Sequence, residues 1–231
     1  MYPQIPARFS EHLFCEAILK DPRKTEEERY AALFCFEKEL KTLGFRLIAG
    51  VDEAGRGPLA GPVAAAAVIL PEDARLPGLN DSKAISASRR AFLAERIRTL
   101  AVAWAVGMAS AEEIDVLNIR QASFLAMRRA LDGLAVKPDH VVVDGGAIPG
   151  FPLPQTGMVR GDARVAAVAA ASIIAKVTRD GLMEELDDAF PAYGFRRHKG
   201  YPTPEHLEAL RRFGPTPFHR KSFAPVKLLL G

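Results

Sequence analysis

Two adjacent acids, Asp52 and Glu53, close a short apolar run that begins at Arg46, and a Gly-Arg-Gly turn follows at residues 55–57. A short apolar run closed by turn residues is typical of a buried strand. Carboxylates at the mouth of such a strand are costly unless another charge offsets them, and a bound metal ion is the usual partner. The pair therefore indicates metal-assisted chemistry, although solvated surface acids are the commoner interpretation of an isolated Asp-Glu pair.

The turn after these acids offers backbone groups that can bind a ligand. Successive strand residues point to opposite faces, so the two carboxylates converge only where the chain bends. Gly55, Gly57 and Pro58 supply that bend, and the glycines leave two backbone N–H groups uncovered beside Arg56. A phosphate or a hydroxyl group can approach such backbone donors.

Two further acids stand where a regular element ends or begins. Asp144 closes the apolar run from His140 and precedes two glycines, and Asp162 precedes an alanine-rich helical segment at 163–180. A helix cap, worth about 1 kcal/mol, is as good an interpretation of Asp162 as a catalytic role. Four such carboxylates, with no neighbouring Cys or His pair, favour Mg²⁺ or Mn²⁺ over Zn²⁺. Two such ions about 4 Å apart can promote cleavage of a phosphodiester bond.

Basic and aromatic residues that suit phosphate or sugar accompany these acids. They are Arg56, Lys83, Arg160, Lys176 and the run 196–201, which ends in Tyr201. A tyrosine ring can stack on a sugar or a base, and half-buried packing is an equally good interpretation from local sequence. Lys176 either orients a carboxylate or extends toward solvent. His198 and His219 are either proton shuttles or surface residues, and the surface is favoured because no fixed spacing ties them to the acids.

The composition is that of an ordinary globular protein, with 231 residues of which 48% are hydrophobic and 26% charged. The sequence has no apolar run long enough to span a membrane and no export signal at the N-terminus, so we expect a cytoplasmic protein. Cys15 and Cys35 are interpreted as reduced packing residues. Residues 196–231 carry eight Lys or Arg against two Asp or Glu, which is either a phosphate-facing patch or a solvated basic surface.

Alternating apolar runs and helical periodicity predict an α/β sheet covered by helices over residues 46–231, after a helical extension at 1–45. In the extension we expect disorder at 1–8 and two helices within 10–43, the first capped by Ser10, with a break near Asp21. Trp104 is expected to pack in the core. Strands are expected in the two apolar runs of 46–70 and at 102–108 and 140–144. Helices are expected after Ser86 and at 111–119, 121–134, 163–180, 179–190 and 203–213.

These stretches resemble the ribonuclease HII family, the type 2 ribonucleases H. The matching stretches are 49–63, Asn80-Asp-Ser-Lys83, 143–145, 161–162 with 169–180, and 198–203, in the family's order. The resemblance implies a ribonuclease H-like α/β fold, with a mixed central sheet flanked by helices and a helical C-terminal portion from about residue 181. It covers about residues 46–226, so the N-terminal helical extension lies outside it.

The resemblance also implies an activity. The family cleaves the RNA strand of RNA–DNA hybrids endonucleolytically, leaving 5′-phosphate and 3′-hydroxyl ends, with Mn²⁺ or Mg²⁺ as cofactor. Its members also incise 5′ of single ribonucleotides embedded in duplex DNA, which implies a role in DNA replication and ribonucleotide excision repair. The implied partners are therefore an RNA–DNA hybrid and ribonucleotide-containing duplex DNA. We expect a monomer with no membrane partner.

The same resemblance implies which residues are catalytic and which bind the substrate. The implied catalytic and metal-binding acids are Asp52, Glu53, Asp144 and Asp162. The implied substrate-binding residues are Gly55, Arg56, Gly57, Lys83, Arg160, Lys176 and Tyr201. The Gly-Arg-Gly loop matches the family's sensor of the ribose 2′-hydroxyl, and Tyr201 matches the tyrosine that stacks on the following deoxyribose. Arg160 stands where lysine is frequent in the family, which keeps the charge but alters the detailed phosphate contact.

Two other function classes fit part of this pattern. A DNA nuclease or strand transferase on the same fold shares the carboxylate–metal chemistry, but it has no use for a hydroxyl-sensing loop. A non-catalytic nucleic-acid-binding module leaves the four acids unexplained, because they would repel phosphate.

Overall fold

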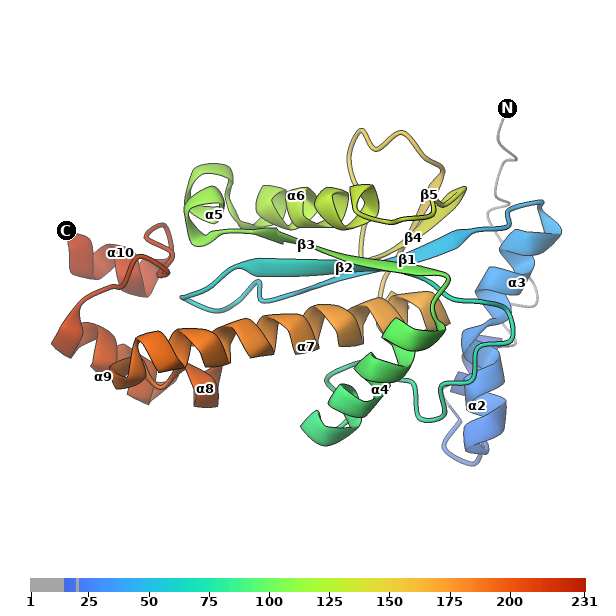
Figure 1. Cartoon of the computed structure of the whole chain (residues 1–231), viewed down its shortest axis with the longest axis horizontal. Coiled ribbons are helices and arrows are strands. Elements are labelled where there is room, and N and C mark those ends of the chain that lie inside the picture. The colour runs from blue at the N-terminus through green and yellow to red at the C-terminus, as the bar shows by residue number, and fades with distance from the viewer. Residues whose placement is uncertain (1–14, 20) are drawn as a thin grey trace.

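A five-stranded mixed sheet lies between two layers of helices in the computed structural model, which describes residues 15–19 and 21–231 (Figure 1). In chain order the strands are β1 (Ile48–Ala54), β2 (Val63–Ile69), β3 (Ala103–Ala109), β4 (His140–Asp144) and β5 (Gln155–Met158). Their order across the sheet is β3-β2-β1-β4-β5. β1 pairs antiparallel with β2 and parallel with β4, and β5 is parallel to β4. The expected α/β architecture is therefore confirmed.

Both faces of the sheet are covered. α5 (Ala111–Leu117) and α6 (Ile119–Asp132) lie on one face, and α4 (Ala87–Leu100) and α7 (Ala166–Ala189) on the other (Figure 1). Every residue of β2 is buried, as is typical of a continuous apolar strand between two layers. Two apolar cores result, one under α6 and one under α4 and α7.

α7 is the longest helix of the described chain, and it differs from its prediction at both ends. It runs unbroken for 24 residues, so the expected division near Arg179 is wrong. Gly181 lies inside it and lowers helix propensity by only about 1 kcal/mol relative to alanine, which is too little to end a packed helix. α7 begins at Ala166, after Val165 as N-cap without a side-chain cap bond. Asp162 is therefore not its cap and lies instead in a 3₁₀ turn, η1 (Gly161–Ala163).

Two features of the sheet edges also differ from prediction. Trp104 on β3 is 38% exposed, so its expected place in the core is wrong. Burial alternates along β3, and Trp104 falls on an outward position, with the Arg98 guanidinium 5.6 Å from its ring centroid. The other edge strand, β5, was not expected, because its residues Gln-Thr-Gly-Met lack an apolar pattern.

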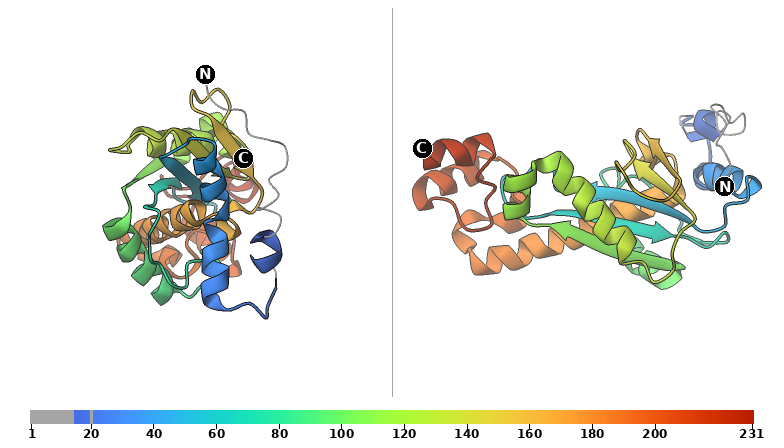
Figure 2. Two further views of the ribbon diagram at one scale, coloured as in Figure 1. Left: turned by 90° about the vertical axis from the view of Figure 1, so that its right-hand side faces the viewer. Right: turned by 90° about the horizontal axis from the view of Figure 1, so that it is seen from above.

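The N-terminal helices lie at one end of the sheet (Figure 2). Residues 15–19 are helical, and α2 (Glu26–Leu33) and α3 (Cys35–Thr42) follow the expected break near Asp21. A turn at Phe34 splits the segment predicted as one helix. The expected disorder at 1–8 and the cap at Ser10 lie outside the described residues. The boundary of the extension at residue 45 stays a prediction.

A disulfide joins Cys15 to Cys35, so the expectation of reduced cysteines is wrong. The packing of two helical segments brings the Cα atoms of the two cysteines to 6.5 Å, within the range that a disulfide spans.

Across residues 15–19 and 21–231, none of the helices is long and apolar enough to traverse a bilayer. The cytoplasmic location itself stays a prediction.

The C-terminal elements lie at the opposite end of the sheet (Figure 2). They are η2 (Pro191–Tyr193), α8 (Phe195–His198), α9 (Pro204–Phe213) and α10 (Ala224–Leu230). His198 and His219 are buried here with His206, so their interpretation as surface residues is wrong. The Nε2 atoms of His206 and His219 are 3.0 Å apart, and burial lowers the pKa of both rings to about 4. At neutral pH both rings are therefore uncharged, and one donates a hydrogen bond to the other.

The first prediction concerns the contact of α7 with β1. Gly50 of β1 lies so close to α7 that a Cβ atom there would overlap the backbone of Ala167 and Val168. Gly50→Ala should therefore lower the free energy of unfolding by about 1–3 kcal/mol or more. Gly181→Ala, at a helix position with no atom within 4 Å of a new Cβ, should raise it by about 1 kcal/mol. Urea unfolding measures both, and a Gly50→Ala protein as stable as the parent would contradict this packing.

Candidate active site

Three carboxylates meet at one edge of the sheet. The parallel register of β1 and β4 aligns Asp52 with Asp144. η1 brings Asp162 to the same place, where the Gly161 N–H donates to Asp144 Oδ1 over 2.7 Å. One oxygen from each of Asp52, Asp144 and Asp162 lies within 4.8 Å of the others. We call these three residues the acid cluster.

The acid cluster is poorly hydrated, so its like charges are costly. Asp52 is 4% exposed and Asp162 is 6% exposed. Burial, followed by the charges of Glu53 and Asp144, raises the pKa of Asp52 well above its usual range. Burial and the nearby acids Asp81 and Asp144 raise the pKa of Asp162 to about 6. Hard oxygen donors this close together fit Mg²⁺ or Mn²⁺, whose charge would offset the repulsion.

Glu53, the fourth predicted acid, stands beside the acid cluster and is not part of it. Its Oε1 accepts a hydrogen bond from Arg56 Nη1 over 3.0 Å. Burial raises the pKa of Glu53, and this bond to Arg56 opposes the rise. The bend after β1 therefore brings Arg56, the residue between the two glycines, back to the Glu53 carboxylate.

A cavity of about 330 Å³ opens next to the acid cluster and gathers most of the predicted substrate-binding residues. Its lining includes Asp52, Glu53, Gly55, Arg56, Gly57, Lys83, Asp144, Lys176 and Tyr201. Lys83 Nζ lies 3.8 Å from Asp162 Oδ2, and Lys176 pairs with Asp180 over 2.6 Å. Tyr201 is 44% exposed, and its ring lies against Gly57, where an added Cβ would meet Cε1 at 3.4 Å. The cavity thus presents cations and one aromatic ring to whatever enters it.

Arg160 lies apart from this cavity. It is exposed, has a left-handed backbone with φ of 57°, and lines a separate cavity of about 210 Å³ with Glu16 and Leu19. Its predicted role in substrate binding stays a prediction. The basic run is also less available than its composition indicates, because Arg196 pairs with Asp188 and Lys199 with Glu184.

Sequence analysis missed two buried arginines that donate hydrogen bonds to the backbone of the loop at residues 55–62. Arg220 donates to the carbonyl oxygens of Gly55, Arg56 and Gly61 over 2.6, 2.9 and 3.0 Å. Arg179 donates to three further carbonyls, those of Ala60, Pro62 and Lys199. All these acceptors are backbone atoms, so no pattern of side chains in the sequence could have revealed the partnership.

Sequence analysis also missed the acid Asp81. Its charge is the next cause, after burial, of the raised pKa of Asp162. The following residue, Ser82, shares a hydrogen bond of 2.8 Å with Ser172 of α7, which fixes this loop beside the acid cluster. The sequence does point to this segment, because Asn80-Asp-Ser-Lys83 is one of the stretches that resemble the family. The predicted site residues include only Lys83 from this stretch.

Clustered carboxylates next to lysines that attract phosphate suit hydrolysis of a nucleic-acid backbone. The sheet and its helices place the chain among nucleases of the ribonuclease H-like fold. Ribonuclease H2 from Pyrococcus horikoshii OT3 superimposes with a TM-score of 0.69 at 28% identity, covering 80% of this chain and 97% of that one. Ribonuclease HII from Archaeoglobus fulgidus, solved in complex with PCNA, gives 0.64 at 30% identity, covering 76% and 94%.

Sequence comparison is more specific. The ribonuclease HII family profile matches residues 49–226. Ribonuclease HII of Myxococcus xanthus is 55% identical over 92% of this chain and 73% of its own length. The Moorella thermoacetica enzyme is 57% identical over 86% of this chain and 96% of its own length. The chain belongs to the ribonuclease HII family, and it is therefore an endoribonuclease that acts on RNA–DNA hybrids.

A second prediction follows from the crowding of like charges. Asp52→Asn should raise the melting temperature of the metal-free protein by roughly 2–4 °C, which is about 1 kcal/mol for a domain of this size. Added Mn²⁺ should raise the melting temperature of the parent much more than that of the variant, because a ligand stabilises the state that binds it. Asp73→Asn, at an exposed acid, is the control and should behave as the parent. A parent without any Mn²⁺-dependent shift would contradict the metal site.

A third prediction concerns the support of the loop. Arg220→Lys removes donors from three carbonyls, and each buried group left without a partner costs about 1–3 kcal/mol. The variant should be less stable in urea and should cleave a hybrid roughly 10- to 100-fold more slowly, because a displaced loop misplaces the substrate. Arg212→Lys, on the exposed side of α9, is the matched control. Equal cleavage by Arg220→Lys and the parent would show that this anchoring is dispensable.

Proposed function

We propose that this chain cleaves RNA–DNA hybrids and also incises duplex DNA 5′ of single embedded ribonucleotides. The products carry 5′-phosphate and 3′-hydroxyl ends, and the cofactor is Mg²⁺ or Mn²⁺. One observation carries the proposal: Asp52 and Asp144 of the acid cluster line the same cavity as the Gly-Arg-Gly loop. Hydrolysis and recognition of the sugar therefore take place side by side. We also propose that the chain acts as a monomer.

The acids supply the hydrolytic half of the site. Asp52, Asp144 and Asp162 would hold the metal, with Glu53 beside them. Bound divalent cations activate water and stabilise the charge that develops on the departing oxygen. Lys83, with its Nζ 3.8 Å from Asp162, offsets part of the negative charge and attracts the backbone phosphate at the mouth of the cavity.

The loop supplies the recognition half. A 2′-hydroxyl is what separates a ribonucleotide from a deoxyribonucleotide at a given position. Backbone groups of residues 55–57 can contact that hydroxyl only if they keep their place, and Arg220 fixes the carbonyls of Gly55 and Arg56. The Tyr201 ring lies next to Gly57 and is exposed enough to stack on the following deoxyribose.

The test uses three duplexes: an RNA–DNA hybrid, a DNA duplex with one ribonucleotide, and the same duplex in all-DNA form. With Mg²⁺ or Mn²⁺ the first two should be cut, and a DNA polymerase should extend the resulting 3′-hydroxyl ends. EDTA should abolish both reactions. Cleavage of the all-DNA duplex would instead indicate a DNA nuclease or strand transferase, and binding without cleavage would indicate a binding module.

A fourth prediction separates junction sensing from general binding. Tyr201→Ala should slow incision at the single ribonucleotide by about tenfold or more, since loss of base or sugar stacking costs about 1–3 kcal/mol. Cleavage within a long hybrid should fall less, because it contains no RNA-to-DNA junction at most positions. Tyr201→Phe keeps the ring and should retain both activities. Equal losses on both substrates would argue against a junction-sensing role.

A further inference from the structure

The first turn of α7 obtains a cap from a distant part of the chain. The first N–H groups of a helix have no partner within it, and the N-cap residue Val165 makes no side-chain bond to them. Glu37 Oε1, on α3, accepts a hydrogen bond from Ala167 N over 2.8 Å. The N-terminal helices therefore satisfy a donor of the helix that follows Asp162.

The first turn of α7 lies between two of the three segments that supply the acid cluster, β1 with Asp52 and η1 with Asp162. On one side, the backbone of Ala167 and Val168 lies directly against Gly50, two residues before Asp52 in β1. On the other side, a Cβ added to Gly161, the neighbour of Asp162, would lie 3.3 Å from Val168 Cγ1. A tilt of the first turn of α7 would therefore change the separation of Asp162 from Asp52.

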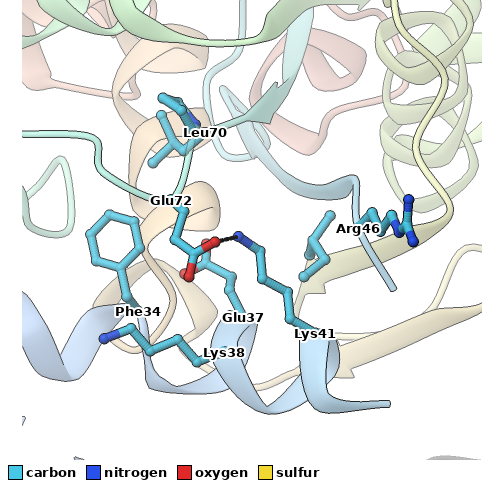
Figure 3. Close-up of a pocket in the computed structure, with 9 residues that line it drawn as sticks. Phe34, Glu37, Lys38, Lys41, Arg46, Leu70 and Glu72 are labelled. Carbon is cyan, nitrogen blue, oxygen red and sulfur yellow. Dashed lines mark hydrogen bonds and ion pairs between the residues drawn. The ribbon is translucent and has the colours of Figure 1, made fainter. Parts of the chain in front are cut away.

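Glu37 is a costly residue for a purely structural role. It is buried, and its second oxygen, Oε2, has no hydrogen-bond partner among the described residues. Burial raises its pKa to about 7, while the bond from Ala167 opposes the rise. Figure 3 shows Glu37 at the small cavity between α3 and residues 70–72, where Lys41 pairs with Glu72 over 2.9 Å. A buried polar atom without a partner is rare in folded proteins and requires a specific explanation.

We propose that Glu37 is a positioning residue for the metal site, acting through the first turn of α7. It fixes where that turn lies between β1 and η1, and so sets the spacing of the Asp162 carboxylate from that of Asp52. The inference rests on the proposed metal-binding role of the acid cluster. It gives the N-terminal helical extension a part in the chemistry, although none of its described residues, 15–19 and 21–45, lines the cavity beside the acids.

The experiment measures Mn²⁺ affinity without substrate, by calorimetry, together with kcat, KM and the melting temperature. Glu37→Leu removes the acceptor at similar volume, so Mn²⁺ should bind about tenfold more weakly, as is usual when a group that orients metal ligands is lost. kcat should fall with KM little changed. Glu37→Gln keeps an oxygen that accepts from Ala167 N and should bind Mn²⁺ within about threefold of the parent.

Tyr30→Phe is the matched control for general loosening of the extension. The Tyr30 hydroxyl donates to Ala74 O over 2.6 Å and accepts from Leu76 N over 2.9 Å, so its bonds hold the extension at a place other than α7. This variant should lose stability and keep the Mn²⁺ affinity of the parent. Should Glu37→Leu fail to fold, Glu37→Asp, which retracts the carboxylate by one methylene, takes its place with the same expectation.

The outcomes are distinguishable. Parental Mn²⁺ affinity in Glu37→Leu or Glu37→Asp, with a lower melting temperature, would overturn the positioning role and leave Glu37 as a stabilising cap. An equal loss of affinity in Tyr30→Phe would overturn it as well, because any loosening of the extension would then suffice. If Asp52→Asn bound Mn²⁺ as tightly as the parent, the proposed metal site would fail first, and this inference with it.

Discussion

The confinement of three like charges in one buried place is the constraint on which this structure depends. Asp52, Asp144 and Asp162 present oxygens within 4.8 Å of one another, and two of these side chains are almost fully buried. Such an arrangement opposes folding of the metal-free protein, because burial and mutual repulsion both favour the protonated carboxyl. It persists because the sheet leaves the side chains no alternative: β1 and β4 are adjacent and in register, and η1 is bonded to Asp144.

The C-terminal portion and the N-terminal helices both support the elements that carry the acid cluster and the loop after it. The C-terminal portion contributes Arg220, which with Arg179 of α7 fixes the loop that follows the first acids through backbone carbonyls. The N-terminal helices contribute Glu37, which caps the helix that follows the last acid. Segments at opposite ends of the sheet (Figure 2) thus support the helix that follows Asp162 and the loop that follows Glu53. A site whose geometry is imposed in this way needs little rearrangement when a cation or a nucleic acid arrives.

Much of the fold, and many of the residues that lie at the candidate site, could be predicted, because apolar periodicity and turn residues are local signals. Asp52 and Asp144 follow buried runs, and their convergence follows from strand pairing.

The predictions that were wrong or missing concern residues whose environment depends on tertiary structure. Asp162 resembles a helix cap, yet α7 starts four residues later, after Val165 with an extended backbone, and its first turn packs on Gly50. Nothing in the sequence indicates that His198 and His219 are buried, because the ring that both contact, that of Phe195, is brought to them only by the fold. Arg220 binds only backbone atoms.

Anomalous diffraction from a crystal soaked in MnCl₂ tests most directly whether the acid cluster binds divalent cations. We expect an anomalous peak in contact with carboxylate oxygens of Asp52, Asp144 and Asp162. Three side chains turned away from one another, with no peak among them, would contradict it.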